Sequence, residues 1–305
     1  MIMTTRRGML AMGGGALALA TMGTRVATAR ALGLPVGVQL WTVKEELAKD
    51  PAGTLKAIRA LGYERVETAG YLGGDPGEFG RMIRAAGLDP LSAHHSLKDL
   101  MDDTDGKVAA AKAVGAKYVV ASSPAPSHPM NPNTKSWPHA VAEAMTLADW
   151  RSNAEAMNRI GKKASAAGLR FGYHNHSAEF LEYDGLVAYD EIARITDPSL
   201  VVFELDLGWV AGAGRDPAAT LTKHGARTHL LHVKDIKARQ PAPGTLVDDE
   251  TTVPIGSGTI AWEPVFAAAR NTAVRGYFVE QEPPFSEPPL EALKKSIAYL
   301  NTLKG

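Results

Sequence analysis

The feature of this sequence that most constrains its fold is a repeated alternation of short β-rich runs with longer amphipathic segments. Eight apolar runs have the length of strands, at residues 36–42, 65–69, 91–96, 117–122, 169–176, 200–207, 229–235 and 276–282. Amphipathic segments rich in Ala and Leu lie between or after them, for example at residues 54–61, 79–86, 148–167, 218–224 and 290–303. This alternation is typical of a parallel β-sheet covered by helices.

Glycine stands at the junction between several of these helical segments and the next strand: Gly62, Gly87, Gly115 and Gly168. Glycine readily adopts the left-handed conformation that ends a helix, so the same helix–strand unit repeats along the chain. We therefore predict a single closed (β/α)8 TIM barrel. An open, doubly wound sheet is the alternative, but no Gly-rich phosphate loop follows the first predicted strand.

The first residues have the features of an export signal. Residues 4–10, TTRRGML, resemble a twin-arginine motif, residues 9–22 are apolar, and Ala27-Thr28-Ala29 fits an A-x-A cleavage site. We predict a twin-arginine signal peptide at residues 1–31, a barrel at residues 32–305, and a periplasmic or secreted protein. The apolar run is shorter than the roughly 20 residues of a spanning helix, so we expect no stable membrane anchor after cleavage.

Charge and cysteine content exclude several functions. The 305 residues include 33 Lys and Arg, 33 Asp and Glu, and no Cys. A balanced charge argues against nucleic acid as a partner, because phosphate binding favours a basic excess. Without Cys the chain has no disulfide, no thiolate nucleophile and no zinc–thiolate site.

Potential metal ligands stand at the ends of the last four predicted strands. They occur in the segments Tyr173-His174-Asn175-His176, Glu204-Leu205-Asp206, His232-Val233-Lys234-Asp235 and Glu280-Gln281-Glu282. Alternate residues of a strand share a face, and neighbouring strand ends meet at one end of a barrel. These carboxylates and imidazoles are therefore expected to converge on one divalent cation. A mixture of both ligand types suits Mn, Zn, Fe or Co better than Ca.

The same segments resemble the xylose isomerase-like barrel family, which contains sugar isomerases, epimerases and inosose dehydratases. The resemblance covers essentially all of the predicted mature chain. It implies metal ligands on the last four strands, commonly Glu, Asp, His and Glu. Asp206, His232 and Glu280 match the last three positions, and the first falls on His174, where the epimerases have a glutamate. His176 is the alternative for that first position.

The expected chemistry is proton abstraction beside a carbonyl group. A cation that binds a keto-sugar acidifies the carbon next to its carbonyl, and a positioned base then removes the proton. The family's epimerases use two metal-bound glutamates on opposite faces, of which Glu280 alone is matched here. This pattern fits a reaction with one base, Glu280, and a separate acid. The candidate acids are His95, Lys234 and Glu67.

Aromatic and polar residues at the predicted barrel mouth are candidates for binding a sugar. Trp41 and Trp209 have ring faces that suit the C–H surface of a sugar, and Gln39 and His176 stand at the ends of predicted strands. Two long connections, residues 124–147 and 236–260, follow strand ends and are expected to form lids or substrate walls.

Our leading interpretation is a divalent-metal-dependent isomerase or epimerase that acts on a keto-sugar or cyclitol through an enediolate. The first alternative is a lyase that performs β-elimination on a 3-keto-glycoside or an inosose. Two alternatives from other classes are a non-catalytic periplasmic sugar-binding barrel and an abasic-site endonuclease, which the neutral charge opposes. The sequence leaves open the exact substrate, the metal, and whether the chain forms a homo-oligomer.

Overall fold

The structure is a computed structural model that describes residues 31–238, 243–244, 246 and 251–303. The predicted signal peptide, residues 1–31, lies outside the described residues except for Ala31. Within the described ranges, no helix combines the length and the apolar character needed to cross a bilayer.

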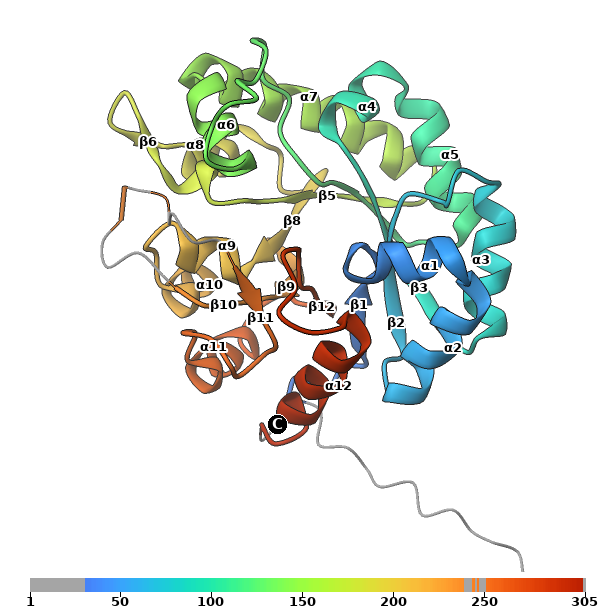
Figure 1. Ribbon diagram of the computed structural model, residues 1–305. Helices are drawn as coiled ribbons and strands as arrows, with labels where there is room; N and C mark the ends of the chain where they lie inside the picture. Colours follow the sequence, from blue (N-terminus) through green and yellow to red (C-terminus); the bar gives the residue numbers. More distant parts are fainter. Residues whose placement is uncertain (1–30, 239–242, 245, 247–250, 304–305) are drawn as a thin grey trace, which may run out of the picture.

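Eight parallel strands form a closed barrel in the order β1-β12-β9-β8-β5-β4-β3-β2. The strands are β1 (Val36–Gln39), β2 (Arg65–Ala69), β3 (Asp89–His95), β4 (Tyr118–Ala121), β5 (Arg170–His174), β8 (Val201–Asp206), β9 (Thr228–Val233) and β12 (Gly276–Val279). Figure 1 looks toward the end of the barrel, with the strands at the centre and the helices around them. The predicted single (β/α)8 barrel is confirmed, and the open-sheet alternative is wrong.

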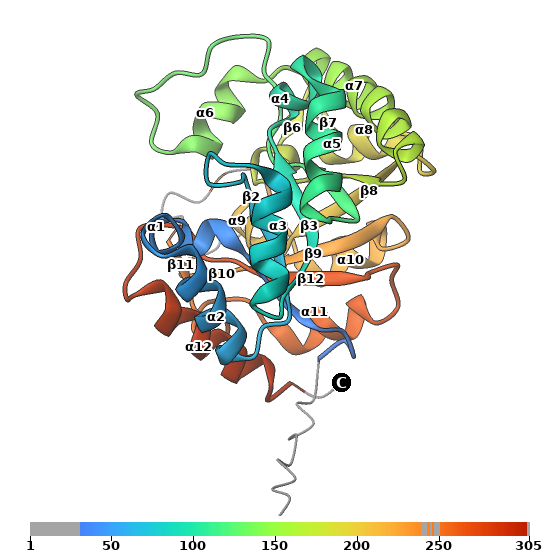
Figure 2. The same cartoon turned by 90° about the vertical axis from the view of Figure 1, so that its right-hand side faces the viewer.

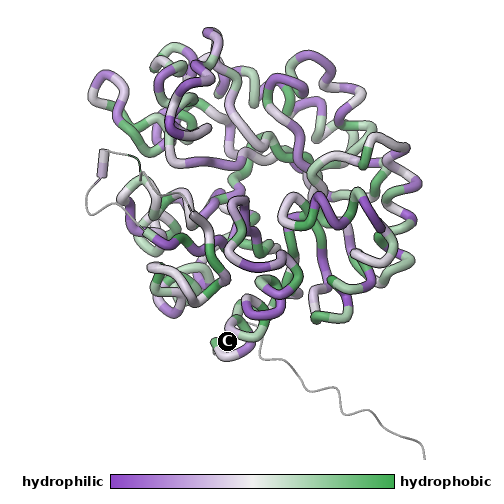
Figure 3. Tube along the Cα trace, in the orientation of Figure 1, coloured by the Kyte–Doolittle hydropathy of each residue, from purple (hydrophilic) through white to green (hydrophobic). Residues whose placement is uncertain are grey.

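The larger outer helices pack against the barrel through one face. They are α2 (Pro51–Leu61), α3 (Pro76–Ala85), α5 (Thr104–Val114), α7 (Leu147–Ala166), α8 (Ala188–Ile195), α10 (Pro217–His224), α11 (Trp262–Ala269) and α12 (Pro289–Leu300). Figure 3 shows hydrophobic and hydrophilic residues alternating along these helices, as expected for helices with one buried side. Gly62 and Gly115 end α2 and α5 with φ values of 108° and 100°, which confirms their predicted role as left-handed caps.

Shorter elements decorate the carboxyl end of the barrel. They are the 3-10 helices η1 (Leu40–Val43) and η2 (Ala178–Phe180), the helices α1 (Lys44–Lys49), α4 (Leu97–Asp102), α6 (Trp137–Ala144) and α9 (Leu207–Gly212), and two hairpins, β6 (Glu182–Tyr183) with β7 (Leu186–Val187) and β10 (Asp235–Ile236) with β11 (Thr252–Val253). In Figure 2, α1, α6, β10 and β11 lie at the same end of the molecule.

Several strands end earlier than the sequence predicts. The runs expected to reach residues 42, 176 and 282 stop at Gln39, His174 and Val279. After Gln39 the chain turns into the 3-10 helix η1, and after Val279 backbone amides pair with side chains instead of a neighbouring strand. The amide of Gln281 donates to Thr42 Oγ1 at 3.0 Å, and the amide of Glu282 donates to Thr252 Oγ1 at 2.8 Å.

Both long connections contain structure at the barrel mouth. The first carries α6, and the second returns to the barrel through β11. Asp235 fixes the second connection, because its Oδ2 accepts hydrogen bonds from the amides of Gly256 and Gly258 and from Trp262 Nε1 at 2.9, 3.1 and 2.9 Å. A Cβ at residue 258 would lie 2.1 Å from Asp235 Oδ1, so glycine is required for this close approach.

The barrel interior contains a compact apolar layer beneath the ionisable residues. It consists of Leu91, Tyr118, Val120, Val202, Leu230 and Phe278, all buried. These residues come from β3, β4, β8, β9 and β12 and fill the cross-section of the barrel, as branched and aromatic side chains do in barrels of this type. The apolar layer closes the barrel from below and leaves its carboxyl end for polar groups.

We predict that Gly80→Ala destabilises the protein at the contact between α3 and α5. An added Cβ would lie 2.2 Å from the carbonyl oxygen of Val114, and backbone cannot yield as a flexible side chain can. The expected loss is about 2 kcal/mol in the free energy of unfolding by urea. Gly74→Ala is the matched control, because its Cβ would meet its nearest neighbour, Tyr71 O, at an ordinary 3.7 Å. Equal stability of the two variants would contradict the packing argument.

Candidate active site

Above the apolar layer, the inner face of the barrel becomes ionisable. Val202, Leu230 and Phe278 of the apolar layer are each followed two residues later by an ionisable residue: Glu204, His232 and Glu280. Because alternate residues share a face of a strand, these side chains continue the inner face toward the carboxyl end. All three are buried.

Asp206, His232 and Glu280 form what we call the outer cluster. Each offers one ligand atom, and these atoms all lie within 4.8 Å of one another. His232 Nδ1 is 2.9 Å from Glu280 Oε2 and 3.7 Å from Asp206 Oδ2. Three of the four ligands predicted from the sequence therefore meet at one point.

Local hydrogen bonds aim Asp206 into the outer cluster. Asp206 caps α9, and its Oδ1 accepts a hydrogen bond from the amide of Trp209 at 3.0 Å. Asn175 clamps the backbone of Asp206 from the neighbouring strand, accepting from its amide at 3.0 Å. With Oδ1 engaged in the cap, Oδ2 is the oxygen left to face His232.

His94, His174, Glu204 and His232 form a second group, which we call the inner cluster; their ligand atoms also lie within 4.8 Å of one another. His174, the fourth predicted ligand, belongs to this group rather than to the outer one. Its Nδ1 is 3.3 Å from Glu204 Oε2, and its Nε2 is 3.9 Å from Asp206 Oδ2. His232 is common to both clusters.

Lys234 provides a fixed positive charge beside the outer cluster. Its Nζ lies 3.0 Å from Asp206 Oδ2, 2.8 Å from Glu280 Oε2 and 2.5 Å from Glu282 Oε1. Burial alone lowers the pKa of Lys234, but these carboxylates outweigh it and raise the pKa well above the usual value. In turn, although burial raises the pKa of Glu280, Lys234 and His232 hold it below its ordinary range, so this carboxyl is ionised at neutral pH.

Burial and neighbouring charges also set the states of the imidazoles. Burial, together with the charge of His232, holds the pKa of His174 well below its usual range, so His174 is a neutral imidazole at pH 7. Burial opposes protonation of His94 as well, but Glu67 and Glu204 raise its pKa to about 9.

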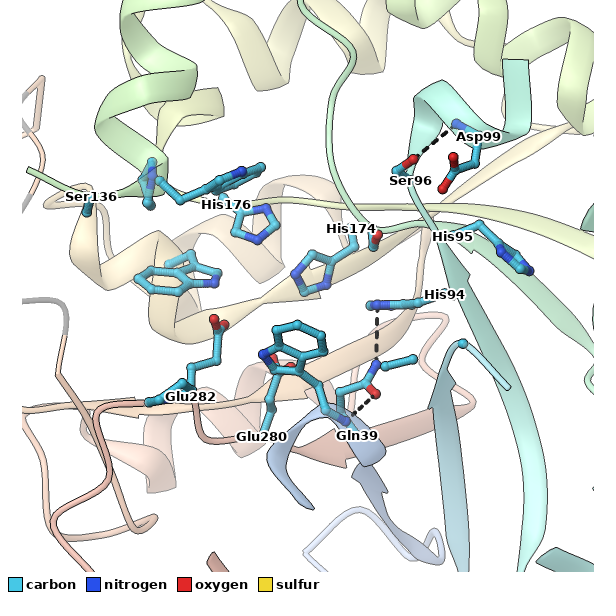
Figure 4. Close-up of a pocket in the computed structure, with 18 of the residues that line it drawn as sticks. Gln39, His94, His95, Ser96, Asp99, Ser136, His174, His176, Glu280 and Glu282 are labelled. Atoms are coloured by element: carbon cyan, nitrogen blue, oxygen red, sulfur yellow. Dashed lines mark hydrogen bonds between the residues drawn. The ribbon is translucent and has the colours of Figure 1, made fainter. Parts of the chain in front are cut away.

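A cavity of about 1110 Å³ opens above these clusters. Gln39, His94, His174, Glu280 and Glu282 line it, and in Figure 4 these side chains surround a common space. The lining does not include Glu67, Glu204, Asp206, His232 or Lys234, each of which is fully buried. Of the predicted catalytic residues, Glu280 and His95 therefore reach the cavity, whereas Lys234 and Glu67 lie behind its lining.

All four predicted substrate-binding residues line the cavity: Gln39, Trp41, His176 and Trp209. Gln39 is held in place by donating from Nε2 to Glu67 Oε2 at 2.8 Å. The ring of His176 contacts those of Trp137 and Trp209, with centroids 4.4 and 5.9 Å away. Sequence reasoning missed Trp137; the signal was an aromatic residue within the long connection at residues 124–147.

The sequence does not decide which of His94 and His95 faces the pocket. Both side chains line the cavity, but only His94 belongs to a cluster. Figure 4 shows the ring of His95 pointing away from His94 and His174. His95 Nε2 is 2.9 Å from the hydroxyl of Tyr71, which also lines the cavity. Burial, assisted by the charge of Lys107, lowers the pKa of His95 to about 4, so His95 is neutral at pH 7.

The sequence of the chain matches a known family of barrel proteins. Residues 55–303 match the family described as xylose isomerase-like TIM barrel. The chain belongs to this family. Inosose dehydratase 1 from Bacillus cereus is 30% identical over 163 residues, which are 49% of this chain and 53% of that protein. The chain thus spans about half the length of the curated relatives it matches.

Two solved structures place the fold among known barrels. A sugar phosphate isomerase/epimerase from Parabacteroides distasonis ATCC 8503 is 25% identical, with a TM-score of 0.71 over 92% of this chain and 97% of that chain. The IOLI protein, crystallised with a zinc atom, is 15% identical, with a TM-score of 0.62 over 88% of this chain and 97% of that one, and shows the shared fold alone.

The outer cluster fits a divalent cation by ligand type and by charge. Two carboxylates and an imidazole are ligands that first-row transition metals accept. With His232 neutral, as a metal ligand must be, Asp206, Glu280 and Glu282 carry three negative charges against one positive charge on Lys234, which leaves two for a dication to balance. Asp206 Oδ2 is buried and makes no hydrogen bond, so it retains the capacity to act as a ligand.

We predict that the buried carboxyl of Glu179 makes the free energy of unfolding fall as the pH rises. It is fully buried, accepts a hydrogen bond from Tyr173 at 2.7 Å, and burial raises its pKa from 4.5 to about 7. Between these values only the unfolded chain releases the proton, so stability falls as the pH rises through this window. Glu179→Gln removes the ionisation and should gain about 2 kcal/mol over the wild type between pH 5 and pH 8, measured by urea unfolding.

The matched control is Glu155→Gln, at an exposed position, whose stability should follow the wild type across the same pH range. If the curve of Glu179→Gln stays parallel to that of the wild type, the buried carboxyl does not carry the shifted ionisation.

Proposed function

We propose that the protein is a divalent-metal-dependent enzyme that removes a proton beside the carbonyl of a keto-sugar or cyclitol and then eliminates a β-substituent. The observation that carries this proposal is the position of Glu280. It is the one carboxylate of the two clusters that also lines the cavity, so it can touch both a bound cation and a substrate.

Asp206, His232 and Glu280 would hold the cation, with His174 close enough to Asp206 to complete the set. When bound, a divalent cation would supply a Lewis acid that polarises the substrate carbonyl and lowers the pKa of the adjacent C–H. We leave the metal as Mn, Zn, Fe or Co, since these accept carboxylate and imidazole ligands together.

Glu280 acts as the base. Its carboxyl is kept ionised by Lys234 and His232, and the barrel holds it on the cavity lining. Removal of the C–H proton by Glu280 leaves the electron pair on the substrate as an enediolate. Collapse of the enediolate re-forms the carbonyl, shifts the C=C bond to lie between the α- and β-carbons, and breaks the bond from the β-carbon to its oxygen, which leaves as water or an alcohol after taking up a proton.

Tyr71 and His95 form a pair that can deliver that second proton. With its proton on Nε2, the neutral His95 donates to the Tyr71 oxygen 2.9 Å away. This arrangement leaves the phenolic O–H free to point into the cavity and toward the leaving oxygen. The sequence predicts His95 as an acid; in this scheme it supports Tyr71.

Elimination is favoured over epimerisation because the site is chemically asymmetric. Two-sided proton exchange needs a base on each face of the substrate carbon. Where the family's epimerases carry the second glutamate, this chain has His174, which lines the same cavity as Glu280, and burial lowers the pKa of His174, so its imidazole is a poor proton acceptor. The inosose dehydratases among the relatives support this choice. Analysis of the products would distinguish elimination from isomerisation or epimerisation.

The size and lining of the cavity support a substrate larger than one sugar ring. A volume of about 1110 Å³ exceeds what a single ring fills, and Trp41 and Trp137 expose 39% and 38% of their surface beside it. Aromatic faces of this kind bind the C–H surfaces of sugars or an aromatic substituent. A 3-keto-glycoside therefore fits the cavity better than a free inosose.

We predict that Glu280→Gln lowers the rate of exchange between substrate carbon and solvent deuterium by at least about 100-fold. The wild type and the variant are incubated in deuterated water with a panel of keto-sugars, inososes and 3-keto-glycosides, and exchange is followed by NMR. Because Glu280 is also a candidate ligand, the metal content of each sample is measured alongside.

Glu287→Gln, outside the cavity lining, is the matched control and should exchange at the wild-type rate. An unsaturated product with release of water or an alcohol supports elimination, whereas two epimers would assign the protein as an epimerase. Undiminished exchange in Glu280→Gln would remove Glu280 as the base. Absence of both metal and exchange in the wild type would favour a sugar-binding barrel.

We also propose that the enzyme is exported by the twin-arginine pathway, on the basis of Arg6 and Arg7 in the motif at residues 4–10. Replacing both arginines by lysine should retain the full-length chain in the cytoplasm, because the pathway reads the arginine pair. Cell fractionation and the N-terminal sequence of the product measure this. Arg25→Lys, outside the motif, is the control, and export of the double variant would refute the proposal.

A further inference from the structure

We propose that the inner cluster is a second cation site, distinct from the outer cluster and set deeper in the barrel. Its members are His94, His174, Glu204 and His232, whose ligand atoms lie within 4.8 Å of one another. The function proposed above rests on the outer cluster, and because His232 belongs to both clusters, the two sites are tested through Glu204, His94 and Glu280, each of which belongs to one cluster alone.

The two nitrogens of His232 face the two clusters. Nδ1 lies 2.9 Å from Glu280 Oε2, whereas Nε2 lies 2.7 Å from Glu67 Oε2 and 3.4 Å from Glu204 Oε2. One imidazole can therefore serve both sites, one through each nitrogen. The two clusters have no other residue in common.

The atoms of the inner cluster converge on Glu204. Glu204 Oε2 is 2.6 Å from His94 Nε2, 3.3 Å from His174 Nδ1 and 3.4 Å from His232 Nε2. One carboxylate oxygen is thus surrounded by three imidazole nitrogens that come from β3, β5 and β9. Three imidazoles and a carboxylate match a four-ligand site for Zn²⁺ or Co²⁺.

Unpartnered polar atoms provide an independent indication that a ligand belongs here. Glu204 Oε1, Glu67 Oε1 and His174 Nδ1 are buried and make no hydrogen bond. Glu67 and Glu204 are fully buried, and His174 is 3% exposed. A buried carboxylate oxygen without a partner costs free energy, which coordination to a cation would recover.

The buried carboxylates of this region suit a cation better than a neutral ligand. Glu67 Oε2 and Glu204 Oε2 lie 2.9 and 2.6 Å from His94 Nε2, so two buried carboxylates approach the same atom. Without a metal, protons on His94 and His232 compensate these charges, because, although burial opposes protonation, the carboxylates raise the pKa of both imidazoles. A dication at the inner cluster would take the place of these two protons and leave both imidazoles as neutral ligands.

The location indicates a role different from that of the outer site. Glu204, Glu67 and His232 lie behind the cavity lining, whereas His94 and His174 are part of it, so a cation there would draw its ligands from both layers. Through His232 and His174 it would fix the orientation of groups that face the outer cluster, as supporting shells do around metal ligands. We expect a tightly held cation that positions the outer site.

The experiment measures stoichiometry and spectra rather than turnover. The full-length protein is stripped with a chelator and titrated with Co²⁺, the visible absorption is recorded, and bound metal per chain is determined by mass spectrometry after dialysis. We expect two cations per wild-type chain. Glu204→Gln should keep one cation and weaken the other site by more than about 100-fold.

Glu280→Gln is the matched control, since it should keep the inner cation while weakening the outer one. His94→Asn provides a second inner variant in case Glu204→Gln does not fold, as judged by circular dichroism. One cation per wild-type chain that is lost in Glu280→Gln but kept in both inner variants would overturn this inference and leave the outer site standing. One cation lost only in the inner variants would instead overturn the outer site.

Discussion

The compensation of buried carboxylates at the carboxyl end of the barrel is the constraint on which the rest of the site depends. The side chains concerned are Glu67, Glu204, Asp206, Glu280 and Glu282, and the first three are fully buried. An apolar layer closes the barrel below them, so they cannot be hydrated from that side. Within reach are one ammonium group and a few imidazoles. A charge arrangement of this kind needs positive groups at short range, which Lys234 and the imidazoles supply and which the proposed cations would add to.

The scaffold holds these charges through bonds to the backbone. Asp206 is fixed by its cap on α9 and by Asn175, while Asp235 folds the second long connection against the barrel mouth. Thr42 and Thr252 accept hydrogen bonds from the backbone of the segment after β12, and this segment carries Glu280 and Glu282. Thr252 belongs to the second long connection, so this connection helps to hold the segment that carries Glu280 and Glu282. The side chains are also linked to one another, because His232 and Lys234 each contact both Asp206 and Glu280.

The site divides into a buried layer that sets charge and an exposed layer that meets substrate. The sequence predicts Lys234 and Glu67 as acids, but both lie behind the cavity lining, where they can tune neighbours and not touch a sugar. Glu280 belongs to both layers. For this reason the proposed chemistry assigns the base to Glu280, and the proposal of elimination rests on the difference between Glu280 and His174. The aromatic wall extends the site beyond the reacting carbon.

The sequence by itself determined the barrel, its eight strands and the meeting of Asp206, His232 and Glu280, because periodicity fixes which face a side chain takes and strand order fixes which ends converge. It did not place His174 beside Glu204, separate His94 from His95, or bring Trp137 to the cavity. Those outcomes depend on the stagger between strands that closure imposes and on loops whose course is set by contacts far along the chain. The alternation of residues along a strand fixes the face toward which each side chain points. The distances between side chains on different strands are set only when the sheet closes into a barrel.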